Sequence, residues 1–319
     1  MYKRLAFLPL LLAACLAGCG TASPTQPRPA PPTPTPEGAS PSPLFEGEYL
    51  GQPRPGLTPE LFAPEVFAVA GSFGHHLHSS LYFSPDGQEV YFTDQSPDTS
   101  EVLPLFMRQE DGRWTAPEVA PFVGIPRGVT SQVFAPDWSR IYLYANPTPG
   151  GDAPTQQDAG FWYMERTASG WSRAHHVGSP ENLDRNEGTL YFSANLPGGF
   201  GDHDLYRTRF LEGRYSDPEN LGEAVNTAAE EYLSCAAPDG SYLIFYRFDP
   251  ANKAASGLHL TFQVRDDAWT EPVPLGDELG LEAGFAASLS PDGQYLFLLD
   301  RGLGIYWVDA QAVESFRRE

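Results

Sequence analysis

The sequence predicts an all-β protein, and more specifically a five-bladed β-propeller of four-stranded antiparallel blades. Three observations carry this prediction: the composition, a recurring turn phrase and a repeat of about fifty residues. The 319 residues are 41% hydrophobic and 13% aromatic, with 31 glycines and 32 prolines. This composition favours strands and turns over helices. The turn phrase occupies residues 84–87, and related phrases lie at residues 135–138, 237–240 and 290–293.

The first turn phrase joins two apolar, aromatic-rich runs within residues 81–93. Pro85 presets the φ angle of the first central turn position, and Asp86 accepts hydrogen bonds from its own backbone. Gly87 takes the left-handed conformation that lets two strands turn back on each other. Each phrase therefore predicts a hairpin.

The repeat is measured at an aromatic or aliphatic position that lies four residues after each turn glycine position. It falls at Tyr91, Tyr142, Tyr191, Ile244 and Phe297, with separations of 51, 49, 53 and 53 residues. A fixed period of this length is typical of a repeat architecture. The chain therefore contains five units.

Each unit holds four strand-like pieces, as a propeller blade does. We predict third strands at residues 105–108, 161–166, 205–209, 258–264 and 305–308. The fourth strands open at Trp114, Trp171, Tyr215 and Trp269. A sandwich of unrelated hairpins is the alternative, and the even spacing disfavours it.

The fifth unit ends after its third strand, with residues 309–316 short and partly helical. Residues 61–66 resemble the fourth strand at residues 114–119 and have no blade of their own. We therefore expect residues 61–69 to pair as the outermost strand of the blade that contains Phe297 and Ile305. This strand would close a ring of five blades, and six blades is the alternative count.

The third unit is short. From Trp171 to the turn position Asn186 there are 15 residues, whereas the equivalent distance in the other units is 23 to 25. We predict that the third blade lacks its inner strand, that an irregular segment at residues 181–184 covers the exposed edge, and that the central channel is wider there.

The N-terminus carries a targeting signal. Lys3 and Arg4 precede an apolar run at residues 5–14, and residues 16–19 read Leu-Ala-Gly-Cys. This resembles the lipobox of bacterial lipoproteins, with residues 1–18 as signal peptide and Cys19 as the lipidated residue. Gly20 stands where the inner-membrane retention signal has Asp, so the resemblance implies the outer membrane or the cell surface, with the propeller in the periplasm or exposed. An ordinary secretory signal or a buried helix is the alternative.

Residues 19–60 are dominated by proline and predict an extended tether. The propeller then spans residues 61–319. Of the three cysteines, Cys15 leaves with the signal, Cys19 carries lipid and Cys235 is alone, so no disulfide is expected.

The formal net charge is −21. An acidic surface repels phosphate backbones, so nucleic acid is excluded as a partner. Cations, basic peptides and neutral sugars remain.

The repeat also resembles a known family. The Ser-Pro-Asp-Gly turns, the Gly-Gly-Phe-Gly run at residues 198–201 and the Pro-Glu-Asn-Leu-Gly run at residues 218–222 look like the WD-like repeat of bacterial envelope propellers. That family includes the TolB-type propeller of the Tol–Pal system. The resemblance covers about residues 61–308, and it implies a binding or scaffolding role without a catalytic set.

Candidate binding residues lie where the long connections share one face of the ring, at residues 94–103, 146–160, 194–204 and 248–257. Loops on such a face are free to vary. His75, His76 and His78 lie near the channel mouth, where His76 and His78 with a carboxylate could hold a metal. A solvated polar rim is the simpler interpretation.

Acidic residues form the second group of candidates. Glu230, Glu231 and Glu282 precede inner strands, and converging carboxylates are what a five-bladed glycosidase uses. Their simpler role is to brace neighbouring blades. The run Asp202, His203, Asp204 could bind a cation, although such an aspartate more often caps backbone amides.

The sequence thus predicts a monomeric, lipid-anchored envelope propeller that binds a protein or glycan through its loop-rich face. We expect no catalysis and no cofactor, with a divalent cation left open. The alternative is a five-bladed glycoside hydrolase, which needs two carboxylates roughly 5–10 Å apart in a pocket.

Overall fold

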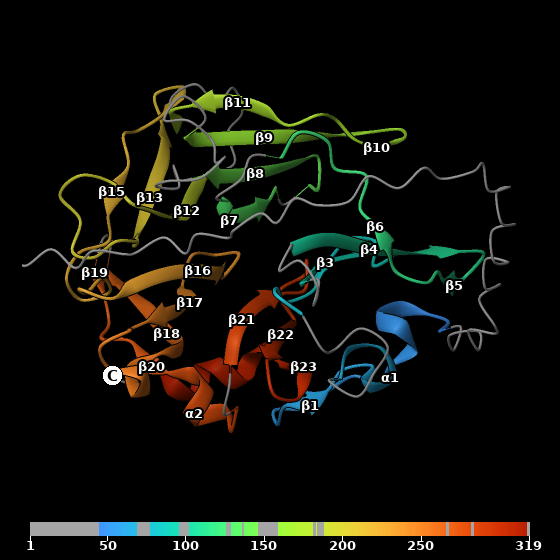
Figure 1. Cartoon of the computed structure of the whole chain (residues 1–319). Helices are drawn as coiled ribbons and strands as arrows, with labels where there is room; N and C mark the ends of the chain where they lie inside the picture. The colour runs from blue at the N-terminus through green and yellow to red at the C-terminus, as the bar shows by residue number, and fades with distance from the viewer. Residues whose placement is uncertain are drawn as a thin grey trace, which may run out of the picture. The chain divides into compact units, whose positions relative to one another are not determined.

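The computed structural model describes residues 45–68, 77–95, 102–125, 129–135, 137–145, 159–180, 183, 188–265, 268–281 and 284–317. Pro43–Glu319 form one compact unit. Its described part contains five antiparallel sheets in a ring (Figure 1). The chain is therefore a five-bladed β-propeller, as predicted.

The sheets follow one another along the chain. The first holds β2 (Tyr82–Phe83), β3 (Glu89–Gln95), β4 (Val102–Glu110), β5 (Arg113–Trp114) and β6 (Glu118–Val119). The second holds β7 (Val129–Phe134), β8 (Arg140–Ala145), β9 (Gly160–Thr167), β10 (Gly170–Trp171) and β11 (His175–Gly178). The third holds β12 (Thr189–Ala194), β13 (Asp204–Leu211), β14 (Arg214–Tyr215) and β15 (Glu219–Asn220).

The fourth sheet holds β16 (Glu230–Ala236), β17 (Tyr242–Phe248), β18 (Gly257–Arg265), β19 (Ala268–Trp269) and β20 (Val273–Pro274). The fifth holds β21 (Gly284–Leu289), β22 (Tyr295–Asp300), β23 (Gly304–Asp309) and β1 (Glu60–Leu61). Short helices are η1 (Glu48–Gly51), α1 (Pro64–Phe67), η4 (Lys253–Ala255), α2 (Leu275–Leu279) and η5 (Ala310–Phe316).

The outer strands differ from the prediction in one respect. In the first four blades the outer position is divided into two short pieces, such as β5 and β6, which both pair with β4. The aromatic residue expected to open the strand ends the first piece instead and is buried, as Trp114 is.

The N-terminal strand closes the ring by pairing with the blade that the sequence predicted. β1 pairs antiparallel with β23, and the Phe62 backbone N–H donates to the Ile305 carbonyl at 2.8 Å. The predicted extent was wrong, because the strand stops at Leu61. Ala63 takes a left-handed φ of 39°, which turns the chain, and Pro64 begins α1.

Helix α1 is held by close packing on the first residue of β23. A Cβ at Gly304 would lie 2.5 Å from the Phe67 carbonyl oxygen and 2.6 Å from the Ala68 Cα. Gly304 also has a φ of 128°. A side chain at this position would therefore clash with the segment that closes the ring.

Residues 45–51, which we expected to belong to the tether, contact the propeller instead. The Trp114 backbone N–H donates to the Phe45 carbonyl at 2.9 Å, and the Trp114 indole N–H donates to the Gly47 carbonyl at 2.8 Å. The Tyr49 ring lies 5.0 Å from Phe83 and 5.4 Å from Tyr295, centroid to centroid. This segment therefore joins the first and fifth blades.

The core is divided into five apolar clusters in the described residues, one between each pair of neighbouring sheets. Alternate residues of a strand enter different clusters, as a period of two requires. In β8, Tyr142 and Tyr144 face the third blade, whereas Ile141 and Leu143 face the first. Each sheet thus buries both faces.

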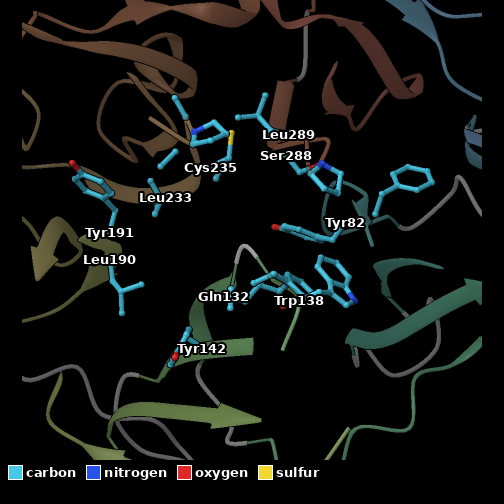
Figure 2. Close-up of a pocket in the computed structure, with 18 of the residues that line it drawn as sticks. Tyr82, Gln132, Trp138, Tyr142, Leu190, Tyr191, Leu233, Cys235, Ser288 and Leu289 are labelled. Carbon is cyan, nitrogen blue, oxygen red and sulfur yellow. The ribbon is translucent and has the colours of Figure 1, made fainter. Parts of the chain in front are cut away.

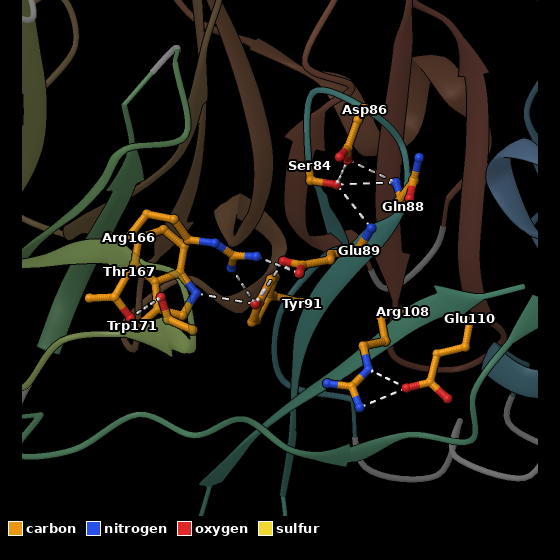
Figure 3. A network of polar contacts seen from close by, with 11 residues as sticks. Ser84, Asp86, Gln88, Glu89, Tyr91, Arg108, Glu110, Arg166, Thr167 and Trp171 are labelled. Atoms are coloured by element: carbon orange, nitrogen blue, oxygen red, sulfur yellow. Dashed lines mark hydrogen bonds and ion pairs between the residues drawn. The ribbon is translucent and has the colours of Figure 1, made fainter.

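The turn phrases close through side-chain oxygen atoms (Figure 3). Ser84 Oγ donates to Asp86 at 2.6 Å and accepts from the Glu89 backbone N–H at 2.9 Å. Ser290 and Asp292 make the same contacts in the fifth blade. The Ser-Pro-Asp-Gly phrases of the first and fifth blades are therefore the same hydrogen-bonding unit.

A polar network joins the first and second blades (Figure 3). The Arg166 guanidinium donates to Glu89 at 2.5 Å and to the Tyr91 hydroxyl at 3.2 Å. The Trp171 indole N–H donates to the same hydroxyl at 3.1 Å. Tyr91 in turn donates to Glu89 at 3.0 Å, so both blades contribute to one closed network.

The third blade lacks its inner strand in the described chain, as predicted. No described strand pairs with the inner edge of β12. Within residues 181–184, the segment expected to cover this edge, only Leu183 is described, and it is buried in the cluster between the second and third blades.

Strand β12 and the residue before β13 also bond to the neighbouring fourth blade. The buried Ser193 Oγ accepts a hydrogen bond of 2.6 Å from the backbone N–H of Leu233, in the inner strand β16. The His203 carbonyl accepts from the Glu231 N–H at 2.7 Å on the same edge. The third blade therefore occupies hydrogen-bonding positions along the inner edge of the fourth.

Replacement of Phe62 by Ala tests the closure. Phe62 is fully buried and contacts Phe67, Phe297 and Trp307. Loss of a buried aromatic ring leaves a cavity, so we expect the free energy of unfolding, measured with urea, to fall by about 3–5 kcal/mol. The exposed Leu57 supplies the control, and Leu57→Ala should have little effect. Equal losses in the two variants would contradict the closure.

Candidate functional site

Glu231 is a bracing residue. Its side chain is fully buried and accepts hydrogen bonds from the Thr227 hydroxyl at 2.7 Å and from Arg247 Nε at 2.8 Å. Arg247 also donates to the Val225 carbonyl at 2.7 Å. The ion pair therefore ties β16 and β17 to the connection from the third blade, and its oxygen atoms are occupied.

Glu230 belongs to a different group, because adjacent residues of a strand point to opposite faces. The Tyr232 hydroxyl donates to Glu230, and His203 Nδ1 lies 3.3 Å from that hydroxyl and 3.6 Å from the carboxylate. Burial lowers the pKa of His203, although the nearby Glu230 and Asp202 act in the opposite direction. Burial, together with the hydrogen bond to Glu230, raises the pKa of Tyr232. The group is a neutral histidine and tyrosine beside one carboxylate.

Asp204 caps the preceding loop. Its carboxylate accepts from the backbone N–H groups of Phe200 at 2.7 Å and Gly201 at 3.1 Å, and from the Asn220 amide at 2.9 Å. The side chain is buried, whereas Asp202 is exposed. These contacts correspond to the capping role considered from the sequence.

His78 lies at the start of the first blade. Its ring meets Phe285 edge to face at 5.4 Å, and burial and the nearby Arg301 lower its pKa. His76, Glu282 and Cys19 lie outside the described residues. The described candidates therefore fall into separate groups around Glu231, Glu230 and His78.

The described residues hold neither a cluster of metal ligands nor a helix that could span a membrane. In that part of the chain no three His, Cys, Asp or Glu side chains gather closely enough to hold a metal ion. No described helix has the length and apolar character that a membrane span needs.

The sequence did not reveal an axial cavity of about 280 Å³. Its wall comes from all five blades, and Figure 2 shows Tyr82, Gln132, Tyr191, Cys235 and Leu289 around one open space. Pro85, Pro238 and Pro291 also line it, so the cavity lies on the side of the turn phrases. The long loops lie on the other side of the ring.

The missing inner strand shapes this cavity. In the third blade the middle strand β12 lines the cavity directly, through Thr189, Leu190 and Tyr191. The fourth and fifth blades line the cavity with their inner strands, β16 and β21. The predicted widening of the channel at the third blade stays a prediction.

The lining is aromatic and uncharged in the described residues: it includes Tyr82, Phe134, Trp138, Tyr142 and Tyr191, but no Asp, Glu, Lys or Arg. Burial raises the pKa of the Cys235 thiol to about 12, so the sulfur is protonated at neutral pH and is a poor nucleophile. Burial also raises the pKa of Tyr82.

Trp138 is the strained residue of this wall. It occupies the glycine position of the second turn phrase with a φ of 58°, which costs about 1 kcal/mol or more for a residue with a side chain. Its ring stacks on Phe134 at 4.1 Å. The Trp at the glycine position of this phrase is the one sequence feature that could have pointed to an aromatic wall here, and none of the sequence predictions used it.

No protein-family model matches this chain, and no curated protein matches it. The resemblance to the WD-like and TolB-type repeats therefore stays a prediction, while the propeller fold itself is shown.

Solved structures give weak similarities. An α-L-arabinofuranosidase from Lactobacillus brevis is 12% identical, with a TM-score of 0.42 over 75% of this chain and 86% of that chain. An α-L-arabinofuranosidase from Podospora anserina is also 12% identical, with a TM-score of 0.39 over 75% and 91%. The β-propeller domain of the Trilobed protease from Pyrococcus furiosus is 10% identical, with a TM-score of 0.33 over 70% and 64%. None of these similarities supports an argument about activity.

Replacement of Glu231 by Gln tests the bracing role. It leaves the Arg247 charge without its carboxylate in a buried setting, so we expect the free energy of unfolding to fall by about 3 kcal/mol. Glu110→Gln is the matched control, because the Glu110–Arg108 pair is exposed and should contribute less than about 1 kcal/mol. Urea unfolding followed by tryptophan fluorescence measures both, and a small effect of Glu231→Gln would contradict the bracing role.

Proposed function

We propose that this protein is a lipid-anchored envelope propeller that binds a protein or glycan partner without catalysing a reaction. The proposal rests on the axial cavity. Its volume is close to that of small-ligand pockets, and aromatic walls with few polar groups are typical of binding sites. The aromatic faces suit an apolar side chain or the face of a sugar ring.

The rival function is hydrolysis of a glycoside by two carboxylates in a pocket. The described lining of the axial cavity has no carboxylate. Glu231 is paired with Arg247, and Glu230 accepts a hydrogen bond from Tyr232. These contacts favour binding over hydrolysis.

Attachment to the membrane is the second part of the proposal. The lipobox-like residues 16–19 and the proline-rich segment after them support an anchor and a spacer. We expect the outer membrane or the cell surface, a monomeric propeller and no nucleic-acid partner.

Filling the axial cavity tests the binding function. Leu289 is half-buried and lines the cavity, so Leu289→Trp should occupy its space. We expect the tagged variant to recover at least tenfold less of the protein or glycan that co-purifies with the natural sequence from envelope fractions. Leu211→Trp, at an exposed position of β13, should recover it fully.

Two results would contradict the binding function. One is equal recovery by the Leu289→Trp and Leu211→Trp proteins. The other is release of sugar from aryl glycosides or envelope glycans by the natural sequence, with that activity lost in Glu230→Gln.

Replacement of Cys19 by Ala tests the anchor. The natural sequence should enter the detergent phase and incorporate labelled fatty acid, and the variant should become soluble or stay unprocessed. A Cys19→Ala protein that still carries the label would contradict lipidation at this residue.

A further inference from the structure

A second cavity, of about 370 Å³, lies on the loop side of the ring between the fourth and fifth blades. Tyr246, Lys253, His259, Asp277, Phe285 and Arg301 are among the residues that line it. We call it the Arg301 cavity. Its wall includes residues 248 and 253–257, which belong to one of the long connections that the sequence predicted to share a binding face. Of the described candidates named one by one from the sequence, none lines the cavity, although the ring of His78 touches Phe285.

Arg301 differs from the other stacked arginines of the described chain. Seven described arginines lie over an aromatic ring, and six of them also pair with a carboxylate. Arg301 lies 3.4 Å from the centre of the Phe285 ring and makes no ion pair with a described residue. The chain has 41 acidic and 20 basic residues, so a missing counter-charge is unusual here.

The surroundings of Arg301 make an anion favourable. Burial lowers the pKa of Arg301, and the opposing effect comes from the Tyr246 hydroxyl rather than from a carboxylate. A partly desolvated charge gains more from a charged partner than an exposed one does. Stacking on Phe285 restricts the guanidinium plane, whose parallel N–H groups fit the two oxygen atoms of a carboxylate.

The remaining wall offers partners for hydroxyl groups. His259 Nδ1 lies 2.9 Å from the Gly257 carbonyl, which only accepts, so Nδ1 carries the proton. Burial lowers the pKa of His259, which leaves Nε2 as an acceptor. The exposed Asp277 adds a second acceptor, and Tyr246 and Phe248 add aromatic surface.

We propose that the Arg301 cavity binds an acidic sugar, with the Arg301 guanidinium holding the sugar carboxylate while His259 and Asp277 accept hydrogen bonds from its hydroxyl groups. Tyr246 and Phe248 contact the ring. The cavity volume lies within the range of small-ligand sites. This inference goes beyond the proposed function, which rests on the axial cavity, and it stands even if the axial cavity binds nothing.

The test is calorimetric titration of the full chain with three probes. Glucuronate carries the carboxylate and the hydroxyl groups, glucose lacks the carboxylate, and N-acetylalanine presents a peptide-like carboxylate without the sugar ring. We expect glucuronate to bind at least tenfold more tightly than either of the other probes, and its affinity to fall with added salt.

Arg301→Gln should weaken glucuronate binding about tenfold or more, because a hydrogen-bonded charge pair is lost. Arg317→Gln is the matched control. Arg317 also lies over a ring, that of Phe262, but it is paired with Glu314, and it does not line the cavity. This variant should bind glucuronate as the natural sequence does.

The stability of the free protein separates binding from a structural role. Since Arg301 has no described counter-charge, Arg301→Gln should leave the urea midpoint unchanged or higher. Glucuronate should raise the midpoint of the natural sequence and of Arg317→Gln, but not that of Arg301→Gln. The proposal is overturned if glucuronate binds no better than glucose, if N-acetylalanine binds in its place, or if Arg301→Gln keeps the affinity.

Discussion

The pairing of β1 with β23 is the contact on which the ring depends. Each sheet is apolar on both faces, so an open row of five sheets would leave two large apolar faces in water. The closing segment brings Phe62 and Phe67 into the cluster between the fifth and first blades, where they meet Phe83, Phe297 and Trp307. Two residues of strand therefore supply the alignment, and the aromatic packing that follows supplies most of the stabilisation.

The third blade shows how the ring accommodates a blade that has no inner strand among its described residues. In the described part of the chain, no strand pairs with the inner edge of β12 beside the channel. The Ser193 hydroxyl accepts from the backbone of β16, so β12 is tied to the fourth blade through a side chain. Leu190 and Tyr191 of the same strand line the axial cavity on that side.

Local chemistry explains what the sequence could predict. The turn phrases depend on residues within four positions of one another, such as Ser84 and Asp86, and the third strands follow a period of two. The end of β1 was not predictable in this way, because α1 is set by its contact with Gly304, which is distant in the chain.

Likewise, the neighbours Glu230 and Glu231 look equivalent in sequence. Only packing shows that Glu231 forms a buried ion pair, whereas Glu230 contacts a tyrosine. That Arg301 has no carboxylate partner among the described residues depends on its surroundings and has no sequence signal.

The N-terminal segment that packs on the first and fifth blades has a mechanical consequence. Phe45 and Gly47 bond to Trp114, and Tyr49 and Leu50 are packed in the cluster beside them. A force that pulls on the chain ahead of residue 45 acts first on these contacts and then on the strand that closes the ring. The interface between the first and fifth blades therefore sets the resistance of the propeller to tension. Fewer than twenty-five residues near the start of the described chain hold this interface together. The other four interfaces between blades bear load only after it has opened.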